Sequence, residues 1–273
     1  MSTADELVVH YANYIKGKVI IITGVSPGSL GAYFVQVIAK GRPAWIILAA
    51  HDVKKAQQTE AAIAASNPDV KMRILPLDLE SLQSVREAAA IINERSDIPV
   101  VDVLVNNAGK LSNEYGVTVD GFERQLATNH LGHFLFTNLI MDKILASAHG
   151  ESSTSAATAI MNTMFYGLWS NQDGEYLVST SLTKRLGEKH GLLAFSLHPG
   201  VILTNALRAL DRVLGNVEGR ADYSPDILPI EKGTATHVYA AFDPNLSAMG
   251  DKPFEAEKLW RLSEKLVGQK FSY

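Results

Sequence analysis

Short apolar runs that alternate with longer amphipathic segments are the feature that most constrains the fold of this chain. Runs rich in β-branched residues, such as Val19–Thr23 and Trp45–Ala49, are typical of buried strands. Segments with helical apolar periodicity follow them, from about Gly31 and from Val53 to Ser66. Because strands that are apolar on both faces need cover on both sides, this alternation predicts a parallel sheet with helices on both faces.

The same pattern continues along the chain. Further strands are expected at Met72–Leu75, Val101–Val105, Thr158–Thr163 and Leu193–Leu197. Further helices are expected at Ser81–Arg95, with Ser81 or else Ser84 as the N-cap, and within Phe122–Ala148, as one long helix or two short ones. Leu182–His190 is expected to be the end of a helix, and Glu255–Leu266 the last helix. The C-terminal third is expected to be loop-rich up to that last helix. No linker or repeat divides the chain, so we expect one doubly wound (Rossmann) α/β domain over residues 1–273, with a substrate lid at about residues 203–230.

Composition excludes several classes of function. The formal net charge of −4 gives no electrostatic reason to expect nucleic acid or an anionic membrane as a partner. The absence of cysteine excludes disulfides, thiolate metal sites and cysteine nucleophiles, and it is compatible with a reducing compartment. Residues 1–18 contain no long apolar run, so neither a signal peptide nor a spanning helix is expected. We therefore expect a cytoplasmic protein.

A glycine-containing turn, TGVSPGSLG at Thr23–Gly31, joins the first expected strand to the first helix. Glycines allow such a turn to be tight and to approach a ligand closely, and the N–H groups at a helix start can bind a pyrophosphate. An ordinary glycine turn has the same composition, but this one follows the first strand of an alternating α/β chain. The predicted cofactor contacts in this turn are Gly24, Ser26, Gly28, Leu30 and Gly31.

This turn resembles the Thr-Gly-x-x-x-Gly-x-Gly turn of the short-chain dehydrogenase/reductase family, with one extra residue before its last glycine. Other motifs resemble the same family in the right order: Asn106-Asn107-Ala108-Gly109 after the fourth strand, Asp78-Leu79 after the third, Asn129 in ATNHLGHF, and His198-Pro199-Gly200 followed by Val201 and Thr204. The resemblance spans roughly residues 15 to 270. Its C-terminal part is similar to the branch of retinol-dehydrogenase-like and WW-domain-oxidoreductase-like proteins, especially fungal ones.

The resemblance implies an oxidoreductase that interconverts a carbonyl and an alcohol on a lipophilic small molecule, with a role in secondary metabolism. It also implies roles for individual residues. Asp78 would bond the adenine, Asn129 would kink its helix and place a catalytic lysine through water, and the loop after Pro199 would meet the nicotinamide. Leu79, Asn106, Ala108, Gly109, Val201 and Thr204 complete the predicted cofactor contacts. A homodimer is one option, since members of this family often pair through helices beside the sheet.

The end of the second strand bears on the choice of nicotinamide cofactor. An acid there would hold the ribose 2′-hydroxyl of NAD, whereas a cation favours the 2′-phosphate of NADP. His51 stands where relatives usually have arginine, and it is only partly charged near neutral pH, so Lys54 or Lys55 would supply the missing charge. Asp52 argues for NAD but lies one position late to bind the ribose. We predict NADP(H).

The catalytic positions depart from the family pattern. The resemblance implies a serine after the fifth strand and a tyrosine acid whose pKa is lowered by a lysine one helical turn later. Met164 and Phe165 fill the hydroxyl positions, and Thr180 fills the lysine position that follows the candidate acid, Tyr176. Of the four catalytic positions of the family, only the asparagine, Asn129, clearly matches the family pattern.

Chain length accounts for part of this departure. From Tyr176 to His198 the chain is shorter than the family pattern by about two helical turns, so Tyr176 could instead belong to the preceding loop. Lys184 lies ~12 Å further along a straight helix, too far to pair with Tyr176 directly. Two explanations stay open: a natural variant that lost or replaced its proton donor, or a gene model that omits a short coding segment. Sequencing the transcript separates them.

Three functions are consistent with these observations. The first is the NADP(H)-dependent carbonyl/alcohol oxidoreductase. The second is a catalytically altered member that reduces an iminium, which leaves no oxyanion to protonate, or that catalyses a cyclisation or isomerisation. The third is a non-catalytic cofactor-binding protein. No metal site is expected, because His130, His133 and His198 lack carboxylates at ligand spacing.

Overall fold

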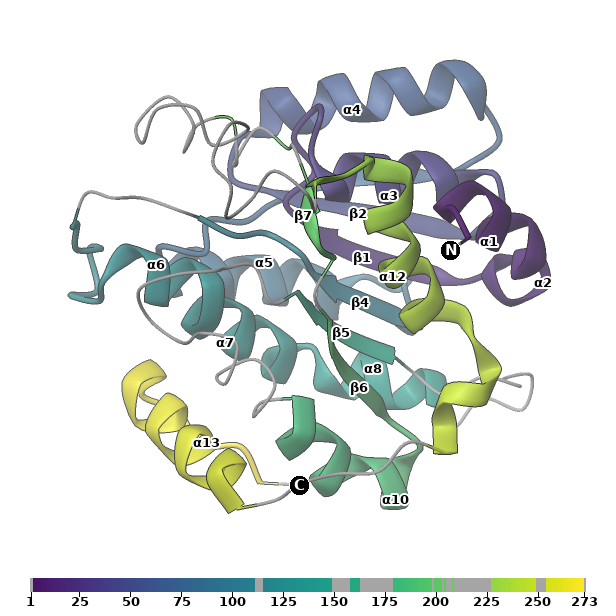
Figure 1. The fold of residues 1–273 in the computed structure, drawn as a ribbon. Coiled ribbons are helices and arrows are strands. Elements are labelled where there is room, and N and C mark those ends of the chain that lie inside the picture. The colour runs from purple at the N-terminus through teal and green to yellow at the C-terminus, as the bar shows by residue number, and fades with distance from the viewer. Residues whose placement is uncertain are drawn as a thin grey trace.

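The computed structural model describes residues 2–110, 115–148, 158–162, 179–197, 199–202, 204, 208, 227–248 and 254–272. A six-stranded parallel sheet with the strand order β3-β2-β1-β4-β5-β6 forms its centre (Figure 1). The strands are β1 (Val19–Thr23), β2 (Trp45–Ala50), β3 (Met72–Pro76), β4 (Val103–Asn106), β5 (Thr158–Asn162) and β6 (Leu193–Leu197). The doubly wound α/β fold predicted from the alternation is thereby confirmed.

Helices cover both faces of the sheet (Figure 1). One layer contains α1 (Ala4–His10), α3 (Leu30–Ala39), α4 (Val53–Ser66) and α12 (Ile230–Phe242); the other contains α5 (Leu82–Glu94), α7 (Gly132–Leu139), α8 (Met141–Ala148) and α13 (Phe254–Val267). Residues along β1 alternate between these layers, since Ile20 packs in the core that contains Phe34, and Ile21 in the core that contains Phe134. The β-branched run predicted as a buried strand therefore serves two hydrophobic cores.

Short polar residues start the helices that follow the strands. Ser29 caps α3, Asp52 caps α4 and Ser81 caps α5, each by accepting a hydrogen bond from a backbone N–H in the first turn. Of the two N-caps expected for α5, Ser81 and Ser84, the structure has Ser81. These caps fix where each helix begins, and therefore where the preceding turn meets the carboxyl end of the sheet.

The segment between β4 and β5 forms two helical stretches separated at Ile140, which is closer to the two-helix alternative expected for it. It comprises α6 (Arg124–Leu126), the π-helical turn η1 (Ala127–Leu131), α7 and α8, with a break at Ile140. A π-helical turn inside a helix is a local irregularity that often accompanies a functional site. Asn129 lies within η1, in agreement with the kink that the resemblance implies.

The expectation of a loop-rich C-terminal third was wrong for Ile230–Phe242, which forms α12. The buried face of α12 includes Gly233, Thr234 and His237, which are not typical core residues. The apolar spacing that predicts an amphipathic helix is therefore weak in this segment. Gly233 gives room to Ile202, because an added Cβ would overlap Ile202 Cδ1 and lie 2.7 Å from its Cγ1. Helices α1 and α2 (Ala12–Ile15) were not predicted, since both are short.

Smaller elements complete the described structure. These are η2 (Thr183–Gly187), α10 (Glu188–His190), η5 (Pro244–Ala248), and the strands β7 (Val201–Ile202) and β8 (Ile227–Leu228), which pair in parallel. The expected lid at about 203–230 starts beyond β7 and includes β8, whereas most of it lies outside the described residues. Within the described residues, no helix has the length and apolar character needed to cross a bilayer.

Candidate functional site

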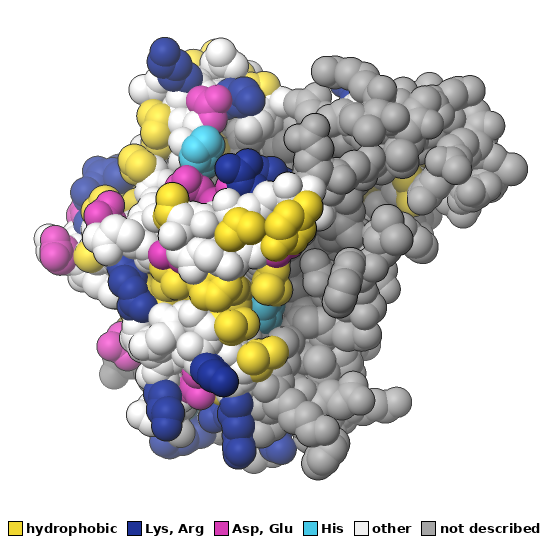
Figure 2. All heavy atoms as spheres, turned by 90° about the vertical axis from the view of Figure 1, so that its left-hand side faces the viewer, with side chains coloured by type: hydrophobic (Ala, Val, Ile, Leu, Met, Phe, Trp, Pro, Cys, Tyr) yellow, Lys and Arg dark blue, Asp and Glu magenta, His cyan; other side chains and the backbone are white. Residues whose placement is uncertain are grey.

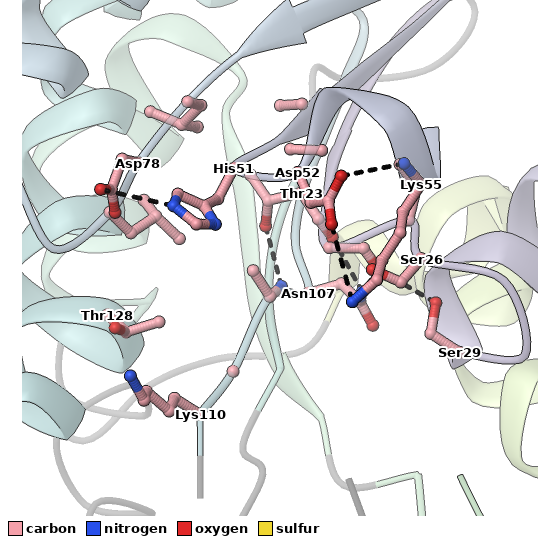
Figure 3. Close-up of a pocket in the computed structure, with 18 of the residues that line it drawn as sticks. Thr23, Ser26, Ser29, His51, Asp52, Lys55, Asp78, Asn107, Lys110 and Thr128 are labelled. Carbon is pink, nitrogen blue, oxygen red and sulfur yellow. Dashed lines mark hydrogen bonds and ion pairs between the residues drawn. The ribbon is translucent and has the colours of Figure 1, made fainter. Parts of the chain in front are cut away.

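The strand order places a cleft at the carboxyl ends of β1 and β4. These neighbours mark the point where the order of strands reverses, which is where open α/β sheets bind ligands. A cavity of about 800 Å³ lies there, lined by the turn after β1, the ends of β2, β3 and β4, and Thr128 of η1 (Figure 3). On the face shown in Figure 2, basic, acidic and histidine side chains gather close together beside apolar ones.

The turns after β1 and β4 hold each other at the base of this cleft. Asn107 Nδ2 donates hydrogen bonds to the carbonyl oxygens of Thr23 and Gly24, at 2.8 and 3.0 Å. Gly24 has a φ of 78°, and a Cβ on it would lie 2.7 Å from Ala108 Cα. Only glycine fits this close approach, which leaves main chain rather than side chains against the cavity.

The start of α3 closes on the same turn. Ser29 Oγ donates to the carbonyl oxygen of Gly24 at 3.1 Å and accepts from the N–H of Ala32 at 3.1 Å. A Cβ on Gly31 would lie 2.5 Å from Gly24 O, so this glycine allows the helix to pack on the turn. Two glycines packed in this way, Gly24 in the turn and Gly31 in the first turn of a capped helix of ten residues, fit a pyrophosphate-binding turn.

Charged groups surround the ends of β2 and β3. His51 Nε2 points at the Asp78 carboxylate, 3.8 Å from Oδ2 (Figure 3). Asp52 Oδ1 accepts the N–H of Lys55 at 3.1 Å, and Asp52 Oδ2 lies 3.7 Å from Lys55 Nζ. The backbone hydrogen bond from Lys55, chiefly, holds the pKa of Asp52 below its usual range, so this carboxylate is ionised and already engaged.

A second charged cluster, which the sequence analysis missed, lines the cleft beyond Asp78. The Glu80 carboxylate lies between Lys110 Nζ, at 2.6 Å, and Arg124 Nε, at 3.3 Å. Thr128 lines the cavity beside Lys110 (Figure 3). The positions of Glu80, two residues after Asp78, and of Lys110, directly after Gly109, were the signals that could have identified both.

Many of the predicted cofactor contacts line this cleft, and others do not. Those that line it are Gly24, Ser26, Leu30, His51, Asp78, Leu79, Ala108, Gly109 and Thr204; those outside its lining are Gly28, Gly31, Lys54, Asn106, Pro199 and Val201. Of the two lysines expected as alternatives at the end of the second strand, Lys55 lines the cleft and Lys54 does not. Asn106 is buried below the cleft and donates to Thr137 Oγ1 at 2.9 Å.

Asn129, the predicted catalytic asparagine, acts on the main chain beside the cleft. Its Oδ1 accepts the N–H of Lys110 at 2.7 Å, and its Nδ2 donates to the carbonyl oxygen of Lys110 at 3.1 Å. Both polar atoms of the side chain are therefore used to fix the chain that leaves β4. Asn129 is 5% exposed and is not part of the cleft lining.

The predicted acid Tyr176 lies outside the described residues. Thr180, at the lysine position, is buried and lines a different cavity of about 620 Å³, bordered by β6 and α12. Lys184 is exposed and belongs to neither lining. Neither residue therefore brings the expected cation to the strand-end cleft.

Comparisons with known proteins agree with this geometry. A family model described as short chain dehydrogenase matches residues 18–212. The chain is 32% identical to human retinol dehydrogenase 13, over 93% of this chain and 86% of that one, and 31% identical to the chloroplastic short-chain dehydrogenase TIC 32 B of Brassica napus, over 97% and 93%.

A solved structure shares the fold. A short-chain type dehydrogenase/reductase from Mycobacterium marinum superposes with a TM-score of 0.68 at 20% identity, over 89% of this chain and 94% of that one. With a parallel sheet in the order 3-2-1-4-5-6, a glycine turn against the end of β4, and a family match over most of its length, this chain belongs to the short-chain dehydrogenase/reductase family of nicotinamide-dependent oxidoreductases.

Proposed function

We propose that this protein is an NADP(H)-dependent oxidoreductase that interconverts a carbonyl and an alcohol on a lipophilic small molecule. The observation that carries the proposal is the cleft where the turns after β1 and β4 hold each other and present Gly24, Ala108 and Gly109 to the cavity. Bound there, the cofactor supplies or accepts the hydride, and the chain binds and orients it.

The charges at the end of β2 support NADP(H). Lys55 and His51 both line the cleft and can approach a 2′-phosphate. The carboxylate that would favour NAD, Asp52, is bonded to the first turn of α4 and to Lys55. An acid engaged in this way is a poor partner for a ribose hydroxyl.

Titration of the purified protein with NADPH and NADH tests this choice. We expect NADPH to bind more tightly, and Lys55→Ala to weaken NADPH binding about tenfold while leaving NADH binding nearly unchanged. Lys54→Ala is the matched comparison and should change neither affinity. Equal affinity for the two cofactors, or a larger effect of Lys54→Ala, would contradict the assignment.

A lipophilic substrate is the finer part of the proposal. It is supported by the likeness to human retinol dehydrogenase 13, whose name states a lipophilic alcohol, and by the apolar residues of the expected lid. We keep Tyr176 as the proposed acid, with Asn129 as a positioning residue, and a role in secondary metabolism as the setting. NADPH consumption with a panel of aldehydes and ketones tests the activity, and Tyr176→Phe should abolish it.

A second candidate is a reduction that needs no tyrosine acid, such as that of an iminium, or a cyclisation. The observation that favours it is the position of Thr180, buried at the lysine position and directed into the cavity bordered by β6 and α12. Under this alternative, Tyr176→Phe leaves turnover of an iminium substrate intact, and carbonyl substrates are not reduced by the wild-type protein.

Three further expectations remain proposals. We propose that residues 1–273 act as one unit with the lid at 203–230, which limited proteolysis tests. We propose a cytoplasmic location because the chain has no cysteine, and cell fractionation tests this. A homodimer is proposed as well, and sedimentation of the purified protein decides it.

A further inference from the structure

A chain of hydrogen bonds lies directly behind the cleft. The backbone N–H of Ala108 donates to Thr23 Oγ1 at 2.8 Å, and Thr23 Oγ1 lies 2.9 Å from His133 Nε2. Thr23 and Ala108 line the cleft, whereas His133 lies on α7 and is only 2% exposed. The chain therefore connects the turns after β1 and β4 to a histidine that cannot touch a bound ligand.

The direction of each hydrogen bond follows from the groups involved. The Ala108 N–H can only donate, so Thr23 Oγ1 accepts it and keeps one proton and one lone pair for the contact with His133 Nε2. The other ring nitrogen decides which of these Nε2 uses: a neutral ring has one N–H, so when Nδ1 carries the proton, Nε2 accepts from the Thr23 hydroxyl. Nδ1 faces the carbonyl oxygen of Asn129 at 3.5 Å, a group that can only accept.

The surroundings keep this histidine neutral. Burial, as the main cause, lowers the pKa of His133 to about 4, and the neighbouring His130 adds to the effect. The N–H of Lys110 is fixed by Asn129, in the turn of η1 that also supplies the carbonyl group facing His133. Residues 108–110 are thus held from two sides by one irregular helical segment.

We propose that His133 is a positioning residue for the cofactor. As the neutral Nδ1–H tautomer, it orients the Thr23 hydroxyl, and this hydroxyl accepts the Ala108 N–H. The two hydrogen bonds together fix the distance between the two turns that form the cleft. The inference rests on the proposed function only in that the ligand is a pyridine nucleotide. Gly24 lies so close to Ala108 that small shifts of either turn change the shape of this wall.

Two pairs of variants test the proposal by NADPH affinity. His133→Leu removes the acceptor, and Thr23→Val removes the hydroxyl with little change of shape; each should weaken NADPH binding about tenfold. The double variant should be no weaker than either single one, because both break the same chain of bonds. His133→Gln, which keeps a polar atom near the position of Nε2, and Thr23→Ser should restore most of the affinity.

His130→Leu is the matched control. His130 is also buried in the same segment, but its Nε2 bonds to Ser263 Oγ of α13, at 2.7 Å, and not to the wall of the cleft. Both leucine variants should lower thermal stability, whereas His133→Leu alone should lower the affinity of the folded protein. Equal affinity losses in the two would overturn the positioning role and leave a packing role only.

Measurements without cofactor separate failure of this inference from failure of the proposed function. In the wild-type protein, ¹⁵N chemical shifts should show the Nδ1–H tautomer of His133, and the Ala108 amide should exchange with solvent slowly. Thr23→Val should accelerate that exchange at least tenfold. An Nε2–H tautomer of His133, or an Ala108 exchange rate that Thr23→Val leaves unchanged, would overturn the inference even if NADPH binds. Slow exchange of the Ala108 amide in a protein that binds neither nucleotide would refute only the proposed function.

Discussion

The Asp52 carboxylate accepts the N–H of Lys55 and lies beside the ammonium group of the same residue, so one side chain both starts helix α4 and restrains the cation proposed to meet the 2′-phosphate. Asp52→Asn keeps a good N-cap but removes the negative charge. We therefore expect an unchanged unfolding midpoint and about threefold tighter NADPH binding. Thermal unfolding and fluorescence titration measure the two quantities.

Asp52→Ala is the control, since it removes the charge and the cap together. It should raise NADPH affinity to a similar degree while lowering the unfolding midpoint. If Asp52→Asn binds NADPH more weakly than the wild type, the carboxylate contributes to the site instead of competing for Lys55.

Gly31→Ala should damage both the fold and the cleft. The added methyl group would lie 2.5 Å from Gly24 O and from Asn107 Nδ2, so either α3 or the turn must move. We expect a loss of about 1–3 kcal/mol in the free energy of unfolding and a marked loss of nucleotide affinity. Gly187→Ala, whose methyl group meets its neighbours at 3.3 Å, should be nearly neutral. Urea denaturation of both variants checks this contrast.

Stability should fall as the pH drops from about 6.5 to about 4. Burial, in each case the main cause, lowers the pKa of His130, His133 and His237 to about 4, from an ordinary value near 6.5. In this window the unfolded chain binds more protons than the folded one, so stability is full above pH 6.5 and is lost towards pH 4. One histidine accounts for about 3 kcal/mol over the whole window.

The slope of unfolding free energy against pH measures this proton uptake. His130→Gln should reduce the slope between pH 4 and 6.5 by about one proton, or ~1.4 kcal/mol per pH unit. Losses below pH 4 belong instead to carboxyl groups such as Asp5, whose pKa is lowered mainly by its hydrogen bond from Lys40. A flat profile between pH 4 and 6.5 would show that these histidines are accessible to protons in the folded protein.

Glu80→Gln should increase the affinity for an anionic cofactor. The substitution removes the negative charge between Lys110 and Arg124, both of which line the cleft. Because these side chains are partly exposed, the unfolding free energy should change by less than about 1 kcal/mol. NADPH titrations at low and high salt should show a gain of about two- to fivefold that shrinks as salt rises. A gain that is independent of salt would argue against an electrostatic cause.

The sequence predicted the part of the fold where local pattern and tertiary environment agree. The helix at Val53–Ser66 and the strand at Leu193–Leu197 have the expected bounds, because their apolar spacing coincides with the faces they bury. Helix α12 was not predicted, since its buried positions include glycine, threonine and histidine. Gly233 is explained by its close contact with Ile202 and not by burial of an apolar side chain. A glycine that makes room for a neighbouring side chain does not add to the helical spacing of apolar residues, so the sequence pattern does not indicate it.

The candidate site divides in a similar way. Motif spacing identified Gly24, Asp78 and Ala108 as residues at the cleft, since each lies one or two residues past a strand end. It could not choose between Lys54 and Lys55, because that choice depends on the rotation of α4 about its axis. It also missed the bond between Thr23 and His133, which joins residues 110 positions apart in the sequence. Contacts of this kind appear only once the chain is folded.

The parallel pairing of Val201–Ile202 with Ile227–Leu228 has a consequence for how this protein could be diversified. It fixes both ends of the intervening segment, residues 203–226, so the entropic cost of closing that segment depends only weakly on how many residues it contains. Doubling that number would add about 0.6 kcal/mol. Segments of other lengths, grafted from relatives into the proposed lid, are therefore expected to leave the nucleotide-binding cleft intact.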